Sequence, residues 1–169
     1  MQRKFYTSLV EKIRSNPLLC KVVTILCKGL PWLVVAAYGV TLVVLLCTWN
    51  LKWIFFVIVP AVTVVLVTLL RNALNRPRPF ERYGYTPLVS HGKGKSFPSR
   101  HTACAVVIGM ACYYVHPAYG IPMLVLSAAV GVTRVMAGVH HIMDVLAGAA
   151  ISVACGVLGF VVFAPLFGL

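Results

Sequence analysis

Residues 53–70 read WIFFVIVPAVTVVLVTLL, a run in which no side chain carries a charge. A helix needs about 20 mostly apolar residues to cross the hydrocarbon core of a bilayer, so this run predicts a membrane-spanning helix. Of all 169 residues, 60% are hydrophobic and 11% are charged, whereas about 25% are charged in soluble domains. The composition therefore excludes a soluble globular fold.

Three further uncharged stretches, 29–51, 101–133 and 145–169, continue the pattern along the chain. The second is long enough for two helices, and Pro117 and Pro122 in its middle indicate a turn at the membrane surface. We therefore expect an all-α, polytopic membrane helical bundle with about five transmembrane helices. Their approximate bounds are 30–49, 53–70, 99–116, 119–137 and 140–165.

The first 28 residues differ from the rest because charged side chains are interspersed with apolar ones. Each charge at the bilayer centre costs about 2.5–3.5 kcal/mol on insertion scales, so a sixth span is not expected here. Segment 1–28 instead predicts a basic amphipathic helix on the membrane surface. It would precede a transmembrane domain over residues 29–169.

Fifteen Lys and Arg residues against three Asp and Glu residues give a formal net charge of +12, which indicates an anionic partner. The basic residues lie between apolar runs rather than along a polar surface. We therefore expect lipid phosphates and membrane lipids as partners, and no nucleic acid. Seven of the fifteen lie in the polar loop 71–101 between the second and third predicted spans, and such loops often carry binding and catalytic groups.

The loop begins with Arg71 and, seven residues later, Arg78. A guanidinium is always charged, and its planar fork of donors matches phosphate oxygens. Arg76 lies between them, and this cluster of three arginines predicts a clamp for an oxyanion. The same pattern is equally typical of a positive flank that anchors a span at lipid headgroups, and this cluster alone does not separate the two interpretations.

The loop ends with Pro98-Ser99-Arg100-His101, directly before an apolar run. Proline in the first turn of a helix costs no hydrogen bond, and the free N–H groups at a helix start bind anions. Ser99 adds a hydroxyl donor and His101 a transferable proton. His91, in a stretch rich in glycine and lysine, is expected to be solvated.

A third cluster, Arg134 with His140, His141 and Asp144, lies between the fourth and fifth predicted spans. Asp144 is the only acidic residue beyond position 81, and an ionisable group at such a place is a functional candidate. If the fifth helix has begun by His140, that residue and Asp144 share a helix face. A carboxylate bonded to one imidazole nitrogen leaves the other free as nucleophile or base. His141 also fits this role by spacing.

With five spans, all three clusters fall on one membrane face. Together they supply arginines for one anion, histidines and an orienting carboxylate, the groups that phosphoryl transfer to histidine needs. This chemistry requires no metal and no other cofactor. A zinc site from His101, His140, His141 and Asp144 is an alternative, although the arginines would repel a dication. A proton-relaying transporter is another, but it would place polar groups in mid-span.

These residues resemble, in order and spacing, the three motifs of the type 2 phosphatidic acid phosphatase family, membrane lipid phosphatases related to vanadium haloperoxidases. The motifs of that family are lysine, six residues and Arg-Pro; Pro-Ser-Gly-His; and Ser-Arg, five residues, His, three residues and Asp. The matching positions are Arg71 with Arg78-Pro79, then Pro98 to His101, then Thr133-Arg134 with His140 and Asp144.

The resemblance implies that His140 attacks phosphorus, that Asp144 orients it and that His101 protonates the leaving oxygen. Water would then hydrolyse the phosphohistidine. The residues that the resemblance implies for phosphate binding are Arg71, Arg78, Ser99 and Arg134. Arg100 replaces the family's glycine, and we expect it to contact a second phosphate or the lipid headgroup.

The resemblance also implies a lipid substrate, with undecaprenyl diphosphate expected first and phosphatidylglycerophosphate or phosphatidic acid as alternatives. A phosphotransferase that uses an acceptor other than water is a further alternative. We expect a multi-pass protein of the bacterial cytoplasmic membrane. Positive charge in the loops favours a cytoplasmic site, whereas bacterial members of the family generally work on the outer leaflet, so the face stays open.

Overall fold

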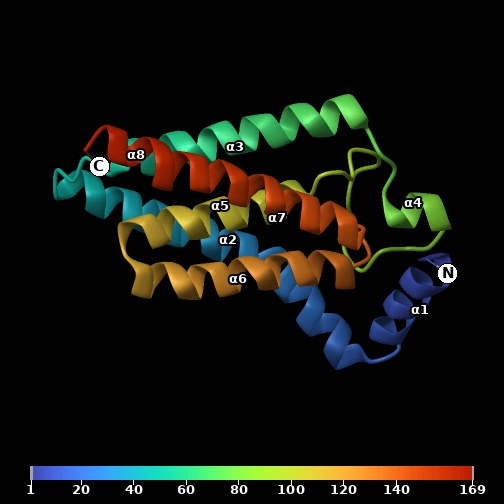
Figure 1. Ribbon diagram of the computed structural model, residues 1–169. Coiled ribbons are helices and arrows are strands. Elements are labelled where there is room, and N and C mark those ends of the chain that lie inside the picture. The colour runs from blue at the N-terminus through green and yellow to red at the C-terminus, as the bar shows by residue number, and fades with distance from the viewer. Residues whose placement is uncertain (1, 169) are drawn as a thin grey trace.

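The computed structural model describes residues 2–168, and the elements within that range are helices, with no strand among them. Most of the helices run lengthwise between two ends of a bundle (Figure 1). In chain order they are α1 (Gln2–Arg14), α2 (Pro17–Cys47), α3 (Trp53–Leu74), α4 (Pro79–Tyr83), α5 (Arg100–Val115), α6 (Pro117–Met136), α7 (Ile142–Gly156), the π-helical η1 (Val157–Phe163) and α8 (Ala164–Leu166). The expected all-α class is confirmed.

Five long helices make up the bundle, and four stretches are long and apolar enough to cross a membrane. These stretches are Pro17–Cys47, Trp53–Tyr83, Pro117–Met136 and Ile142–Leu166. The remaining bundle helix, α5, has 16 residues, about 24 Å at 1.5 Å per residue, which is shorter than the roughly 30 Å hydrocarbon core. The expected polytopic membrane bundle is confirmed, with four helices of spanning length around a shorter fifth.

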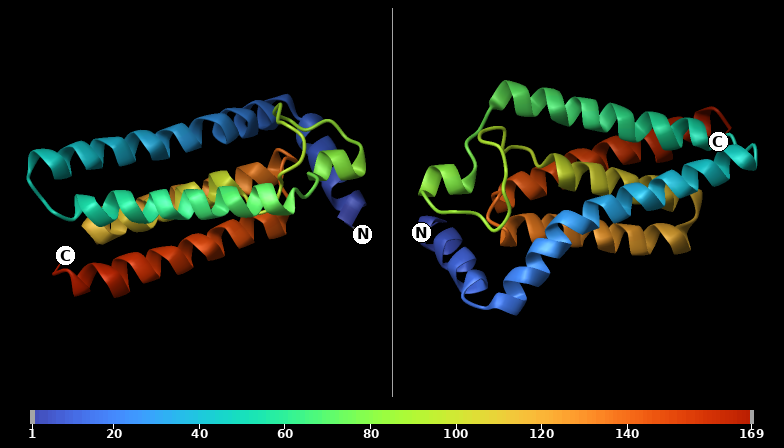
Figure 2. Two further views of the ribbon diagram at one scale, coloured as in Figure 1. Left: turned by 90° about the horizontal axis from the view of Figure 1, so that it is seen from above. Right: turned by 180° about the vertical axis from the view of Figure 1, so that it is seen from behind.

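Helix α5 lies inside the bundle, with α2 and α7 on opposite sides of it (Figure 2). Small side chains make this position possible: Ala103, Ala111 and Cys112 are each 0% exposed. A Cβ added at Gly109 would lie 2.9 Å from Leu124 Cδ2 on α6. Membrane helices pack through such small residues, because lipid gives them little hydrophobic reason to associate.

The outward faces of the bundle carry large apolar side chains. Ile58, Leu66, Val125 and Val161 are between 40% and 66% exposed. Soluble monomers rarely expose contiguous apolar patches of more than a few hundred Å², so this surface fits contact with lipid tails. The chain is thus a multi-pass membrane protein.

Helix α2 begins at Pro17 rather than near residue 30. The Asn16 side chain accepts a hydrogen bond from the Leu19 N–H at 3.1 Å, and proline occupies the first helical position, which are both strong signals for a helix start. The predicted boundary at residue 28 therefore falls inside α2. Lys21 and Lys28 are exposed on this helix, so their long side chains can extend toward headgroups.

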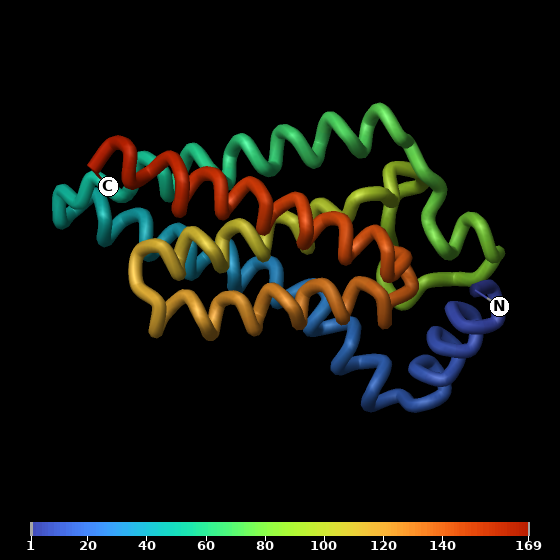
Figure 3. The backbone as a smooth tube through the Cα atoms, in the orientation of Figure 1, coloured from blue at the N-terminus to red at the C-terminus, as the bar shows by residue number. Residues whose placement is uncertain are grey.

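Helix α1, which was expected to lie on the membrane surface, folds back against the end of the bundle beside α4 (Figure 3). Its apolar face, Tyr6, Val10 and Ile13, is 1–4% exposed. The Tyr6 hydroxyl accepts a hydrogen bond from the Ile142 N–H at 3.0 Å. The apolar stripe that indicated a membrane-facing helix is therefore buried against the protein.

Candidate active site

The three polar clusters lie together at the end of the bundle that is on the right in Figure 1. Helix order brings them there, because α3 and α6 end at this side of the bundle while α5 and α7 begin at it. The long connection 75–99 covers the same end. The structure therefore assembles arginines, histidines and one carboxylate from segments far apart in sequence.

Asp144 is the anchor of this end and is 0% exposed. Its Oδ2 atom accepts hydrogen bonds from the His141 backbone N–H at 2.9 Å and from the Ser96 hydroxyl, and the first of these caps the start of α7. Its Oδ1 atom lies 3.4 Å from Arg76 Nη1. Sequence analysis missed Ser96 and Arg76 as partners, because they lie 48 and 68 residues away and no spacing rule connects them.

His140 lies two residues before α7, so the premise that the helix has begun by His140 is wrong. Its Nδ1 atom nevertheless lies 3.6 Å from Asp144 Oδ2, and its Nε2 atom lies 3.3 Å from Arg78 Nη1. A guanidinium can only donate, so this contact makes Nε2 the acceptor. The ring proton then belongs on Nδ1, toward the carboxylate.

Burial is the main cause that lowers the pKa of His140 to about 4. The Asp144 carboxylate opposes this effect, while the positive charge of Arg78 adds to it. At neutral pH the imidazole is therefore neutral, and Nε2 keeps a lone pair, which accepts from Arg78 in this structure and must leave that contact to attack an electrophile.

Arg78 is held in place by the backbone of two loops. It is 2% exposed, and it donates to the carbonyls of Val139 at 2.9 Å and Gly94 at 3.1 Å. The Glu81 carboxylate accepts hydrogen bonds from the N–H groups of Arg78 and Gly94, at 2.9 and 2.8 Å. These contacts fix the guanidinium against His140 and leave part of its donor set for a ligand.

Arg71, Arg78 and Arg134 are buried, with exposures of 9%, 2% and 6%. Within residues 2–168 none of the three forms a salt bridge with a carboxylate. In the same range, Arg134 Nε and His101 Nδ1 are buried without a hydrogen-bond partner. Buried charges and polar atoms are costly unless paired, so this end of the bundle favours an anion with several acceptor oxygens.

Ser99 and Arg100 occupy the start of α5 in different ways. Ser99 is 0% exposed, and its hydroxyl accepts a hydrogen bond from the Thr102 hydroxyl at 3.0 Å. Its backbone N–H donates to the Asp144 carbonyl at 2.8 Å, which joins α5 to α7. Arg100 is exposed at the first helical position, so its expected contact with a second phosphate or headgroup stays a prediction.

A cavity of about 500 Å³ opens at this end of the bundle, between α2 and the loop before α5. Side chains from four segments line it: Cys27, Lys28, Trp32, Val89, Ser90, His91, Gly92, His101 and Arg134. The mouth lies beside α2, where Trp32 is 76% exposed. Of the predicted site residues, His101 and Arg134 line this cavity, whereas His140, which is 0% exposed, is not among its lining residues.

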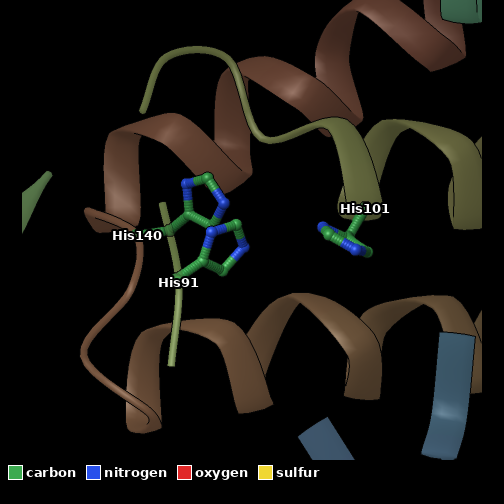
Figure 4. A group of neighbouring side chains, drawn as sticks. All are labelled: His91, His101 and His140. Atoms are coloured by element: carbon green, nitrogen blue, oxygen red, sulfur yellow. The ribbon is translucent and has the colours of Figure 1, made fainter. Parts of the chain in front are cut away.

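His91 was expected to be solvated, and the structure corrects this expectation. The side chain is half-buried and lies with His140 and His101 in one group (Figure 4). One ring nitrogen of each residue lies within 4.8 Å of the others. Val89, two residues earlier, is 5% exposed and packs with Ala137 and Val139. This apolar contact brings the backbone at His91 close to the bundle.

His141 lies apart from this group. Its ring packs edge-on against Tyr6 and Tyr83, with centroids 5.3 and 5.9 Å away. The four residues of the zinc alternative therefore do not converge. Within the described chain, the histidines that could share a cation are His91, His101 and His140, and the buried arginines beside them disfavour a dication.

The family model described as PAP2 superfamily matches residues 51–167 of this chain. A lipid A 1-phosphatase of Rhizobium johnstonii is 33% identical over 122 residues, which are 69% of this chain and 49% of that protein. The undecaprenyl-diphosphatase BcrC of Bacillus subtilis is 32% identical over 84 residues, 50% of this chain and 44% of BcrC. The chain thus spans about half the length of these curated relatives.

Two crystal structures share the fold. That of Aquifex aeolicus LpxE superposes with a TM-score of 0.75 at 24% identity, over 92% of each chain. That of a PAP2-type phosphatidylglycerolphosphate phosphatase from Bacillus subtilis has a TM-score of 0.72 at 24% identity, over 93% of this chain and 81% of the other. The likeness therefore covers the whole bundle.

Proposed function

The chain belongs to the PAP2 superfamily, and from this premise we propose that it is an integral-membrane lipid phosphatase that acts through a phosphohistidine on His140. One observation carries the proposal: the ring of His140 lies between a buried carboxylate, 3.6 Å from Nδ1, and a buried guanidinium, 3.3 Å from Nε2. That arrangement suits a neutral nucleophile aimed at an anionic phosphorus centre.

In the first half-reaction, the Nε2 lone pair of His140 attacks phosphorus. Burial lowers the pKa of His101 to about 3 in the unliganded chain, so the ring takes up a proton together with the anionic substrate. The bond between phosphorus and the leaving oxygen breaks, and His101 gives that oxygen the proton. The Asp144 carboxylate, 3.6 Å from Nδ1, stabilises the positive charge that develops on the ring. The charge on the phosphoryl oxygens is stabilised by the guanidinium groups of Arg71, Arg78 and Arg134 and by Ser99 at the start of α5.

In the second half-reaction, a water oxygen attacks the phosphohistidine, and the proton that this water loses replaces the one that His101 gave to the leaving oxygen. The bond between phosphorus and Nε2 breaks, its electron pair returns to the imidazole, and inorganic phosphate leaves. The arginines supply the positive charge that a metal ion supplies in other phosphoryl-transfer sites. The proposed reaction is therefore metal-independent.

A site beside α2 suits a lipid whose tail stays in the bilayer while its phosphate enters the cavity. Undecaprenyl diphosphate is the first candidate, supported by the similarity to BcrC. Lipid A 1-phosphate is the second, supported by the similarity to the Rhizobium phosphatase, ahead of phosphatidylglycerophosphate and phosphatidic acid. The proposed location is the bacterial cytoplasmic membrane.

The test is phosphate release by the detergent-purified full chain, in EDTA, from a panel of these four lipids, beside the variant His140→Ala. We expect release from at least one lipid and its loss in the variant. Activity that EDTA removes and zinc restores would contradict the metal-independent mechanism. Radiolabel that moves to a second lipid or sugar instead of to inorganic phosphate would identify a phosphotransferase.

A further inference from the structure

His91 is a half-buried titratable group that the proposed mechanism does not use. Its ring stands nearly perpendicular to those of His101 and His140, with interplanar angles of 88° and 78° and centroid distances of 6.0 and 6.2 Å. Figure 4 shows it beside His140, with His101 facing the two from the start of α5. The three rings come from three different segments and surround one small space.

The spacing of the three nitrogen atoms lets two of them share a single oxygen atom. Two hydrogen bonds of about 2.8 Å that meet at a tetrahedral oxygen place their outer atoms about 4.6 Å apart. The ligand nitrogens of His91, His101 and His140 lie within 4.8 Å of one another. A water molecule can therefore contact His91 and His101 together, which leaves the nitrogen of His140 to carry the phosphoryl group that this water attacks in line.

The loop that carries His91 is anchored at several points. The Leu88 N–H donates to the Ala137 carbonyl at 3.0 Å, and Arg14 of α1 donates to the Thr86 carbonyl at 2.6 Å. Val89 is buried among apolar neighbours. These contacts fix the backbone just before His91, so the fold of the loop places the imidazole at the cavity.

We propose that His91 is a third catalytic histidine, which accepts a proton from the water that hydrolyses the phosphohistidine. This inference rests on the proposed function. The water oxygen forms a bond to phosphorus, its proton moves to the free ring nitrogen of His91, and the bond between phosphorus and His140 Nε2 breaks. The protonated His91 then passes the proton to His101, whose ring nitrogen lies within 4.8 Å, and this replaces the proton that His101 gave to the leaving oxygen, so each turnover ends with both rings as they began.

The charge state of His91 suits a proton acceptor. Burial is the main cause that lowers its pKa to about 4, and Arg78, His140, Arg134 and Arg71 lower it further. The ring is therefore neutral before the reaction. A bound phosphoryl group brings negative charge that offsets the arginines and makes the ring a stronger base while the intermediate exists.

The test separates the two half-reactions in the full chain by rapid mixing with a labelled lipid substrate and an alkaline quench that preserves phosphohistidine. In His91→Gln we expect kcat to fall by about 10²-fold, the lower range for general-base catalysis, while phosphoenzyme accumulates in a burst. The matched control is Lys93→Ala, an exposed position in the same loop, which should leave both quantities unchanged. In His91→Ala, added imidazole should restore part of the hydrolysis step.

Unchanged kcat in both His91 variants would overturn the inference. A fall in kcat without accumulated phosphoenzyme would also overturn it, because the defect would then lie before the second step. Failure of the proposed function has a different signature: the wild-type chain would form no phosphohistidine, or His140→Ala would keep its activity. A structural defect alone would not be rescued by imidazole.

Discussion

The two ends of the bundle differ in almost every respect except the helices that join them. At one end, the connection 75–99 and the segment 137–141 hold buried arginines, histidines and a carboxylate. At the other, residues 48–52 and His116 alone connect the helices, and the polar contacts are sparse, such as Lys52 Nζ to the Tyr114 carbonyl at 3.4 Å. Apolar packing builds the bundle together with a few hydrogen bonds between helices, such as those from the Ser127 and Ser152 hydroxyls to carbonyls of α5. Among the described residues, the network of charged side chains lies at one end.

The largest expected difference between the two ends of the bundle is the loss of phosphate release when a histidine is replaced. His140→Asn should lower phosphate release by about 10⁴-fold or more, because the nucleophile is lost, while His116→Asn at the opposite end should leave the rate unchanged. Initial rates with the best lipid of the panel check both. Equal losses in the two variants would mean that the polar end has no special role.

The second effect tests the orienting carboxylate. Asp144→Asn keeps the shape of the side chain but removes the charge that holds the Nδ1 proton of His140. We expect a loss of about 10²-fold or more in kcat, since outer partners of this kind typically contribute about 10–100-fold and a triad carboxylate contributes more. Wild-type kcat in a folded Asp144→Asn protein would contradict the assigned tautomer.

The third effect compares two helical glycines. A Cβ at Gly148 would lie 2.6 Å from the Ser99 carbonyl oxygen, whereas nothing lies within 4 Å of the Cβ position of Gly39 in α2. Gly148→Ala should therefore separate α7 from α5, lower stability by about 1–3 kcal/mol and reduce activity. Gly39→Ala should keep or slightly raise the melting temperature. Thermal unfolding in one detergent measures both, and identical shifts would contradict the close approach.

The fourth effect is the pH dependence of stability. His140 has a pKa of about 4 in the folded chain, against about 6.5 when unfolded, so between these values the unfolded state binds more protons. The stability that this residue contributes is present above pH 6.5 and is lost as the pH falls toward 4. Melting temperatures at pH 7 and pH 4.5 should differ by less in His140→Asn than in the wild type. An equal or larger difference in the variant would contradict the lowered pKa.

The smallest effect is expected at the far end. Lys52→Ala removes a weak contact with Tyr114 and should change stability by at most about 0.5 kcal/mol, with no change in kcat. A large loss of activity would show that the two ends are coupled through the helices. Measuring phosphate release and melting temperature on the same preparation checks both expectations.

The positions of the membrane spans could be predicted from the sequence, but the start of helix α2 was predicted wrongly. The spans followed from uncharged runs, because the bilayer imposes a single length requirement on every helix. The start of α2 at Pro17 did not follow from hydropathy, since Lys21 and Lys28 interrupt the apolar run, although Asn16 and Pro17 form a recognisable helix start. Local capping outweighed the charges because both lysines face outward.

The candidate site also contains residues whose positions the sequence predicted and residues whose positions it did not. The sequence by itself determined that Arg71, Arg78, His101, Arg134, His140 and Asp144 would stand at helix ends on one side of the membrane, because the order of spans dictates where each helix starts and stops. It also predicts an anionic ligand, through an excess of basic residues with few acidic ones.

Only the tertiary structure decided which further side chains lie beside these residues. Ser96, Arg76 and His91 lie in an irregular loop, where no helical or strand period relates a residue to its partner. Their positions depend on contacts from elsewhere: Glu81 ties down the Gly94 N–H, and Val89 packs under the 137–139 segment. Membrane helices follow from local composition, whereas a loop's conformation depends on distant contacts, and those determine which histidines meet.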